Sequence, residues 1–171
     1  MKKYLVLFFG FCCFTCLSQE TPFFNIARKG TIEEAKSYIQ LHPNCINEVN
    51  PHGFSPLILA CYNGNEEMIT FLLANNADLN YVSPEGTVLM AATVKGNEKI
   101  VELLLKKKAN PDLTNKNGTT ALMYAIQFKN TSIINLLLQF NANKSLVNKE
   151  GKTAFEYAVF TKNDEIINLL K

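Results

Sequence analysis

The sequence predicts an all-α protein, a solenoid of helix-turn-helix units joined by hairpin-like loops. The first observation is a motif that recurs four times at spacings of 32, 33 and 33 residues. The second is an apolar segment that follows each copy with the periodicity of a helix. The third is a short polar segment after it, as in Asn76-Ala77-Asp78. One apolar position of the motif holds Leu57, Leu89, Leu122 and Phe155.

The chain begins with a segment typical of an export signal. Two lysines follow Met1, and an apolar run then extends from Tyr4 to Leu17 before polar residues begin. This run is shorter than the roughly 20 apolar residues that cross a bilayer. We therefore expect a signal peptide at residues 1–18, an exported protein that is periplasmic or secreted, and no membrane span in the mature chain.

Cys16 suggests one alternative use of this segment, because bacterial lipoproteins are cleaved just before a cysteine that carries lipid. The residues that precede it, Cys13, Phe14 and Thr15, resemble the usual small-residue pattern poorly. We therefore do not expect lipid anchoring through Cys16.

The charge balance of the mature chain does not favour a general attraction to nucleic acid or to an anionic membrane. Removal of residues 1–18 takes away Lys2 and Lys3 and leaves basic and acidic side chains equal in number. The run from Lys106 to Lys108 is typical of a helix C-terminus, where cations complement the helix dipole. We expect no nucleic-acid partner.

The repeat divides residues 19–171 into successive units. We expect a partial unit at 23–49 and further units at 50–82, 83–114, 115–147 and 148–171, the last of which stops on its second helix. In the partial unit, one short helix ends near Gly30 and a second runs from Ile32 to Leu41. Atypical terminal units are expected in a solenoid, because its end faces meet water.

Helix signals recur at fixed places in each unit. A hydroxyl residue can cap the first helix, and Pro56 follows one of these residues at a position that needs no N–H. Small alanines allow neighbouring helices to approach closely, and glycine suits a left-handed residue at a helix end. The capping residues are Ser55, Thr87, Thr120 and Thr153; the alanines are Ala60, Ala92, Ala125 and Ala158; the glycines are Gly30, Gly64 and Gly96.

These motifs resemble the ankyrin-repeat family. Gly53-Phe54-Ser55-Pro56-Leu57-Ile58-Leu59-Ala60-Cys61 is similar to the first-helix motif Gly-x-Thr-Pro-Leu-His-x-Ala-Ala, and Ile100-Val101-Glu102-Leu103-Leu104 is similar to the second-helix motif Val-Val-x-Leu-Leu. The resemblance covers roughly Phe23 to Lys171. It implies a protein that binds other proteins through loop tips and the exposed, concave side of its first helices.

The chain departs from the family pattern at two positions. Ile58, Met90, Met123 and Glu156 replace the usual histidine, so the hydrogen bonds that this histidine makes between repeats are not expected. Lys129 and Lys162 replace the turn glycine in the last two units, where a left-handed side chain costs about 1 kcal/mol. We therefore predict that the C-terminal units are the least stable.

We find no pattern of a catalytic site, no cofactor motif and no metal motif in the sequence. The strongest candidate is a zinc site made of His42, Cys45, His52 and Cys61. Cys61 lies within the first-helix motif, which favours a small core residue over a ligand. A disulfide between Cys45 and Cys61 stays open as an alternative.

When the positions that bind partners in the family are aligned with this sequence, they fall on residues of units two to five that we expect to be exposed. Several are aromatic, and aromatic residues are enriched in protein interfaces. We interpret Tyr62, Val94, Phe128 and Phe160 as a contact ridge, with packing of Phe54 or Phe160 between repeats as the alternative. The predicted partner-binding residues are Phe54, Tyr62, Asn63, Val94, Lys95, Gln127, Phe128, Lys152 and Phe160.

These observations favour a non-catalytic protein-protein interaction module that acts outside the cytoplasm as a monomer without a cofactor. One alternative within this class is an inhibitor or immunity-type protein that masks a secreted enzyme or toxin. A metal-dependent enzyme that uses His42 and His52 is an alternative of another class. A structural protein that docks onto its own copies is a third.

Overall fold

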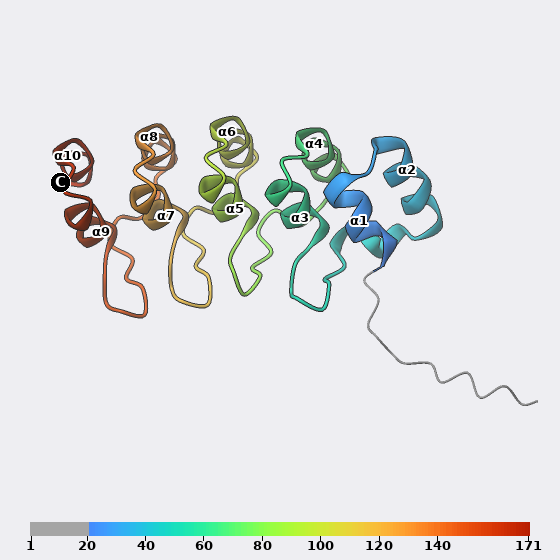
Figure 1. Cartoon of the computed structure of the whole chain (residues 1–171), viewed down its shortest axis with the longest axis horizontal. Helices are drawn as coiled ribbons and strands as arrows, with labels where there is room; N and C mark the ends of the chain where they lie inside the picture. Colours follow the sequence, from blue (N-terminus) through green and yellow to red (C-terminus); the bar gives the residue numbers. More distant parts are fainter. Residues whose placement is uncertain (1–20) are drawn as a thin grey trace, which may run out of the picture.

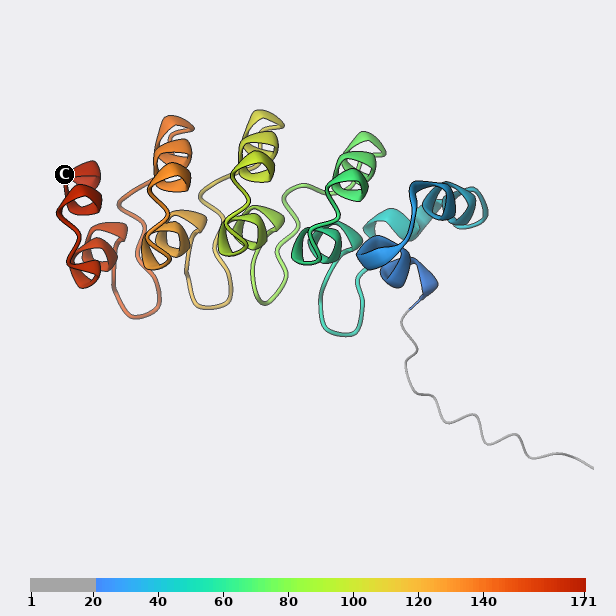
Figure 2. The same ribbon diagram turned by 45° about the horizontal axis from the view of Figure 1, so that its top comes forward.

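The computed structural model describes residues 21–171, which form paired helices stacked in two rows (Figure 1). The predicted signal peptide and Cys16 lie outside the described residues. One row holds the second helices and the other holds the first helices, with long loops projecting below (Figure 2). The first helices are α1 (Pro22–Lys29), α3 (Pro56–Tyr62), α5 (Val88–Val94), α7 (Ala121–Gln127) and α9 (Ala154–Thr161).

The second helices lie antiparallel to the first and complete each pair. They are α2 (Ile32–Leu41), α4 (Glu66–Ala74), α6 (Glu98–Lys106), α8 (Thr131–Gln139) and α10 (Asp164–Leu170). A 3-10 helix, η1 (Pro43–Asn47), forms the loop after α2. Residues 21–171 contain no strand longer than the isolated bridge between Ser83 and Gly86. The all-α solenoid expected from the sequence is confirmed.

Side-chain caps begin the helices as the sequence predicts. The hydroxyl of Ser55 accepts a hydrogen bond from the backbone N–H of Ile58, and Thr87, Thr120 and Thr153 cap α5, α7 and α9 in the same way. The second helices have their own caps, which sequence reasoning missed. Asn65, Asn97, Asn130 and Asn163 each accept a backbone N–H at the start of α4, α6, α8 and α10.

The core runs continuously along the stack. Each first helix packs on the next, from α1 to α9. Ala60, Ala92, Ala125 and Ala158 are all fully buried, and this allows the close approach of neighbouring helices. Ile69 and Leu72 of α4 and their equivalents in α6 and α8 close the other side of the core. Burial of these side chains is the main stabilising contribution to the stack.

The turns between paired helices confirm one prediction and correct another. Gly64 and Gly96 have left-handed backbones with φ of 69° and 67°, and Lys129 and Lys162 adopt the same geometry at 55° and 53°. Gly30 was predicted to be left-handed, which is wrong, because its φ is −79°. A Cβ at Gly30 would lie 2.8 Å from the backbone of Ile26, so close approach is the reason for this glycine.

Hydrogen bonds between successive loops couple the units, although the first helices lack the histidine that is usual in the family. Asn47 Oδ1 accepts the backbone N–H of Asp78 at 2.7 Å, and Asn80 Oδ1 accepts that of Asn110 at 2.9 Å. Asp112 Oδ1 continues the series by accepting the N–H of Asn143 at 2.7 Å. Each bond joins residues about one repeat apart, so the loops form a ladder along the stack.

Candidate partner-binding surface

The last residues of the first helices lie in register along the stack. Counted from the capping hydroxyl of each unit, the same position holds Tyr62, Val94, Gln127 and Phe160, which we call the first-helix row. Because α3, α5, α7 and α9 each start from a hydroxyl cap and pack on their neighbours, the row follows the axis of the stack. Four of the predicted partner-binding residues therefore share one surface.

Phe128 lies one position beyond this row. It is the C-cap residue of α7 and takes the register of Asn63 and Lys95, the C-cap residues of α3 and α5. Adjacent residues of a helix point about 100° apart, so Phe128 is a neighbour of the first-helix row and not a member of it. Gln127 occupies its place in the row.

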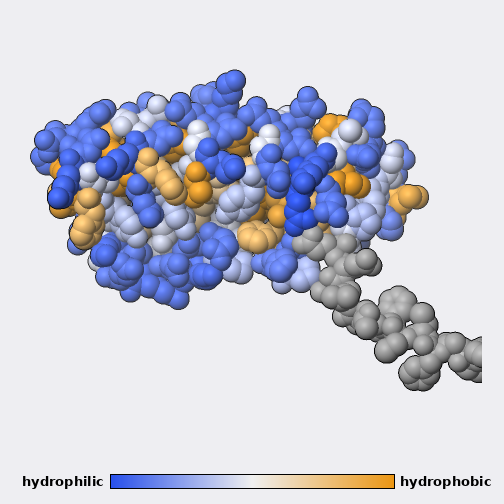
Figure 3. All heavy atoms as spheres, in the orientation of Figure 1, coloured by the Kyte–Doolittle hydropathy of each residue, from blue (hydrophilic) through white to orange (hydrophobic). Residues whose placement is uncertain are grey.

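Exposure separates the aromatic residues into two groups. Phe160 and Phe128 expose 69% and 54% of their surface, while Phe54 and Tyr62 are half-buried and pack against the core. The rings of Phe54 and Tyr62 meet edge to face with centroids 6.1 Å apart. Packing thus accounts for Phe54, whereas Phe160 projects from the stack. In the space-filling view a hydrophobic patch lies over α9, above a largely hydrophilic loop edge (Figure 3).

Lys152 connects the last loop to the exposed end of α9. Its ammonium group lies 5.1 Å from the centre of the Phe160 ring and 2.7 Å from a carboxylate oxygen of Glu150. The hydrogen bond and charge of Glu150 raise the pKa of Lys152, so Lys152 stays a cation at neutral pH. A cation near an aromatic ring is attracted by the ring's electron-rich face.

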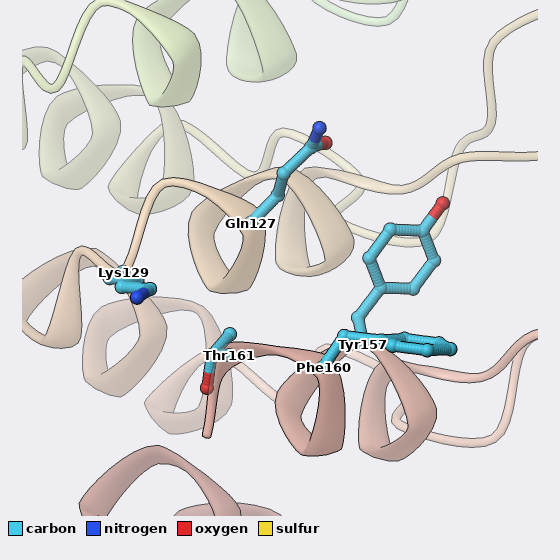
Figure 4. Close-up of a pocket in the computed structure, with 5 residues that line it drawn as sticks. All are labelled: Gln127, Lys129, Tyr157, Phe160 and Thr161. Carbon is cyan, nitrogen blue, oxygen red and sulfur yellow. The ribbon is translucent and has the colours of Figure 1, made fainter. Parts of the chain in front are cut away.

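A hollow of about 320 Å³ lies between the C-terminal ends of α7 and α9. Gln127 and Lys129 line it from the α7 side, and Tyr157, Phe160 and Thr161 line it from α9 (Figure 4). Gln127 and Phe160 were predicted contact residues. Tyr157 and Lys129 were not predicted. For Tyr157 the sequence held a signal, because Tyr124 and Tyr157 occupy a repeat position that is Leu59 or Ala91 in the earlier units.

Buried asparagines fix both the loops and these tyrosines. Asn148 Oδ1 accepts the backbone N–H groups of Glu150 and Lys152, each at 2.9 Å, and its Nδ2 donates to the Tyr157 hydroxyl at 3.0 Å. Asn115 makes the equivalent contacts, with a 2.9 Å bond to the Tyr124 hydroxyl. Burial, followed by the charge of Glu85, raises the pKa of Tyr124, which therefore stays protonated at neutral pH.

The candidate zinc residues do not converge. Within residues 21–171, no three His, Cys, Asp or Glu side chains are placed to hold a metal ion. The His42 ring lies 4.5 Å from that of Tyr38. Cys45 and Cys61 are buried, free thiols, so the open disulfide alternative is not found. Burial raises the pKa of Cys45 to about 11 and that of Cys61 to about 12, which makes both thiols poor nucleophiles.

Paired helices stacked in two rows, with loops that project from one side, define a repeat protein of the helical solenoid class. The sequence model of the family described as ankyrin repeats (3 copies) matches residues 3–83 and 88–171. The chain belongs to the ankyrin-repeat family. Ankyrin repeats bind protein partners, so the fold is that of an interaction module.

Curated relatives share the repeats over a limited part of their length. The chain is 38% identical over 100 residues to the rat ankyrin repeat and SAM domain-containing protein 6, covering 57% of this chain and 11% of that protein. It is 33% identical over 85 residues to the mouse ankyrin repeat, SAM and basic leucine zipper domain-containing protein 1, covering 47% and 18%. It is 30% identical over 115 residues to the rice probable E3 ubiquitin-protein ligase XBOS32, covering 66% and 23%.

The described helices are short. Among residues 21–171, none combines the length and the apolar character that a membrane-spanning helix requires.

Proposed function

We propose that this chain is a non-catalytic module that acts outside the cytoplasm and binds a protein partner through its loop tips and first-helix row. The observation that carries the proposal is the exposure of Phe160 and Val94 in the first-helix row and of Phe128 beside it. Exposed apolar groups on a folded protein are an unfavourable contact with water, and their concentration on one face is typical of interaction sites.

The burial of both thiols and the packing of His42 support a binding role over catalysis. Neither Cys45 nor Cys61 is exposed, and His42 packs on Tyr38. The rice relative is named as a probable ligase, but the part that matches this chain covers only 23% of that protein.

Affinity capture with matched variants tests this proposal. We expect the full-length chain to retain one or more specific proteins from envelope extract or culture fluid, and Phe128→Ala/Phe160→Ala to retain at least tenfold less of them. Leu41→Ala is the control, because Leu41 is an apolar residue of α2 with 78% exposure outside the first-helix row. Equal capture by the double variant would reject the surface assignment.

Export is the second part of the proposal. It is supported by the two lysines and the apolar run at the start of the chain. N-terminal sequencing of the protein recovered from the periplasm or culture fluid should begin at Gln19. An intact Met1 on all recovered protein would contradict cleavage, and sedimentation at several concentrations would test the expected monomer.

A further inference from the structure

The hollow between α7 and α9 offers a place for one apolar side chain. Tyr157 and Phe160 form its aromatic side, and Phe160 remains largely exposed to solvent although Lys152 lies near its ring. In Figure 4 the side chain of Tyr157 rises from α9 beside the Phe160 ring, and Gln127 extends from the neighbouring helix. A ring held in place by an adjacent hydrogen bond, as Tyr157 is by Asn148, gives a contact surface with little entropy left to lose.

Two lysines border this aromatic surface. Lys129 lines the hollow and Lys152 borders it. Of the nearby acids, Glu150 is bonded to Lys152, and Glu156 accepts the hydrogen bonds of Thr153 in the capping box of α9. Asp164 and Glu165 begin α10 and are the acidic groups closest in sequence to the end of α9.

The turn that carries Lys129 is not followed by an acidic residue, unlike the same turn in units two and three. The second helix begins with Glu66 in unit two and Glu98 in unit three, but with Thr131 in unit four. Glu66 and Glu98 line a shared hollow with Lys95. Lys129 therefore has no carboxylate at the corresponding position of its own unit.

The backbone at Lys129 is unusual for a lysine. Its φ of 55° is left-handed, a geometry that Gly64 and Gly96 adopt at the same turn without a side chain. A lysine in this region is strained, and Lys108 and Lys162 have the same left-handed backbone, so the position of Lys129 beside the hollow, and not its strain, carries the argument.

We propose that this hollow binds an acidic segment of a protein partner. One apolar side chain of the segment lies against Phe160 and Tyr157, and neighbouring carboxylates pair with Lys129 and Lys152. This inference rests on the proposed function and specifies the chemistry of the partner. A segment rich in Asp or Glu without an apolar residue would leave the aromatic surface uncovered, and a basic segment would meet like charge.

Selection from a random library of short peptides displayed on phage tests the inference with the full-length chain as target. We expect the enriched peptides to carry net negative charge and at least one Leu, Phe or Trp. The most enriched peptide, synthesised with a fluorophore, would then be titrated by anisotropy. Lys129→Gly should weaken its binding by about threefold, and Lys129→Gly/Lys152→Gln by about tenfold, since each exposed ion pair contributes modestly.

Lys108→Gly is the matched control. Lys108 is also a left-handed lysine, with φ of 69°, but it follows α6 and lies outside the hollow. The same loss of charge and the same relief of strain should leave the peptide affinity unchanged within about twofold, the scatter of weak surface effects. Urea unfolding of each variant confirms that the fold is retained.

Each other outcome overturns the inference. Neutral or basic selected peptides, failure to enrich any peptide, or equal weakening by Lys108→Gly would all reject an acidic ligand at this hollow. Neutral or basic peptides whose binding is lost in Phe128→Ala/Phe160→Ala would reject the inference and leave the proposed function standing. Partner capture that is unaffected by Phe128→Ala/Phe160→Ala would reject the proposed surface itself.

Discussion

Asn148 Nδ2 donates a hydrogen bond of 3.0 Å to the hydroxyl of Tyr157. The same buried side chain accepts the N–H groups of Glu150 and Lys152, so one amide joins the loop that carries Lys152 to the helix that carries Tyr157. Both residues border the proposed ligand hollow. The shape of the hollow therefore depends on a buried residue that does not itself line the hollow.

Replacement of Asn148 tests this dependence. Asn148→Ala removes the acceptor of two backbone N–H groups, and we expect it to lower the free energy of unfolding by about 1–3 kcal/mol. Urea denaturation followed by circular dichroism measures the change. Asn44→Ala, at an exposed residue of η1, should change stability by less than about 0.5 kcal/mol, and a similar loss in both variants would contradict the role given to Asn148.

Stability measurements also distinguish contact aromatics from core aromatics. Phe160→Ala should change the free energy of unfolding by less than about 0.5 kcal/mol, because 69% of the side chain is already exposed. Phe23→Ala should cost about 3–5 kcal/mol, because Phe23 is fully buried and stacks on Tyr38 with centroids 5.5 Å apart. A large loss at Phe160 would show that it packs between repeats.

The fold was predictable because its signals are local and repeat. Ser55 and its equivalents cap α3, α5, α7 and α9, and a small alanine such as Ala60 recurs where neighbouring helices touch. The asparagine network was not predicted. Asn148 and Asn115 act through contacts to loop backbone and to a tyrosine in the helix that follows, and unit three has Ser83 at this position in a shorter turn. A sequence pattern of scattered Asn residues does not reveal which of them become buried.

The register of the proposed contact residues was predictable, while their role in binding stays a prediction. The repeat register places Tyr62, Val94 and Phe160 in one row. Phe128 was assigned to the ridge by its aromatic character, yet it stands one residue later, where the helix has turned by about 100°. The hollow was not foreseen, because it requires the ends of two helices and a turn residue, Lys129, to be placed in space.

The left-handed lysines predict an uneven distribution of stability. Phe155 and Val159 of α9 expose 39% and 48% of their surface, whereas Leu57 and Cys61 at the same positions of α3 expose 1% and 4%. Less burial and the strain at Lys162 both weaken the last unit. Amide hydrogen exchange in α9 and α10 should be faster than in α3 to α6.

A single substitution tests the contribution of strain. Lys162→Gly places glycine where φ is 53° and should raise the free energy of unfolding by about 0.5–1 kcal/mol. Lys171→Gly is a charge-matched control at an exposed residue outside the turn. Better protection of α9 and α10 than of α3 to α6, or destabilisation by Lys162→Gly, would show that the last unit is not the least stable.

The buried thiols make stability sensitive to alkaline pH. The pKa of Cys61 is about 12 in the folded protein against 9.0 for an ordinary thiol, so above pH 9 the unfolded chain loses a proton that the folded chain retains. Proton release then favours unfolding, and the stabilising contribution present below pH 9 is lost progressively as the pH rises toward 12. Denaturation midpoints should therefore decline more steeply with pH in the wild type than in Cys61→Ala.

Alkylation tests the burial and protonation of each thiol separately. Iodoacetamide at pH 8, followed by peptide mass spectrometry, should leave Cys45 and Cys61 unmodified in the native protein and modify both in denaturant, because the folded thiols are buried and protonated. Cys61 also donates its S–H to the carbonyl oxygen of Val88 at 3.7 Å, a contact that only the folded chain offers. Rapid alkylation of native Cys61, or parallel pH profiles for the wild type and Cys61→Ala, would contradict its place in the core between α3 and α5.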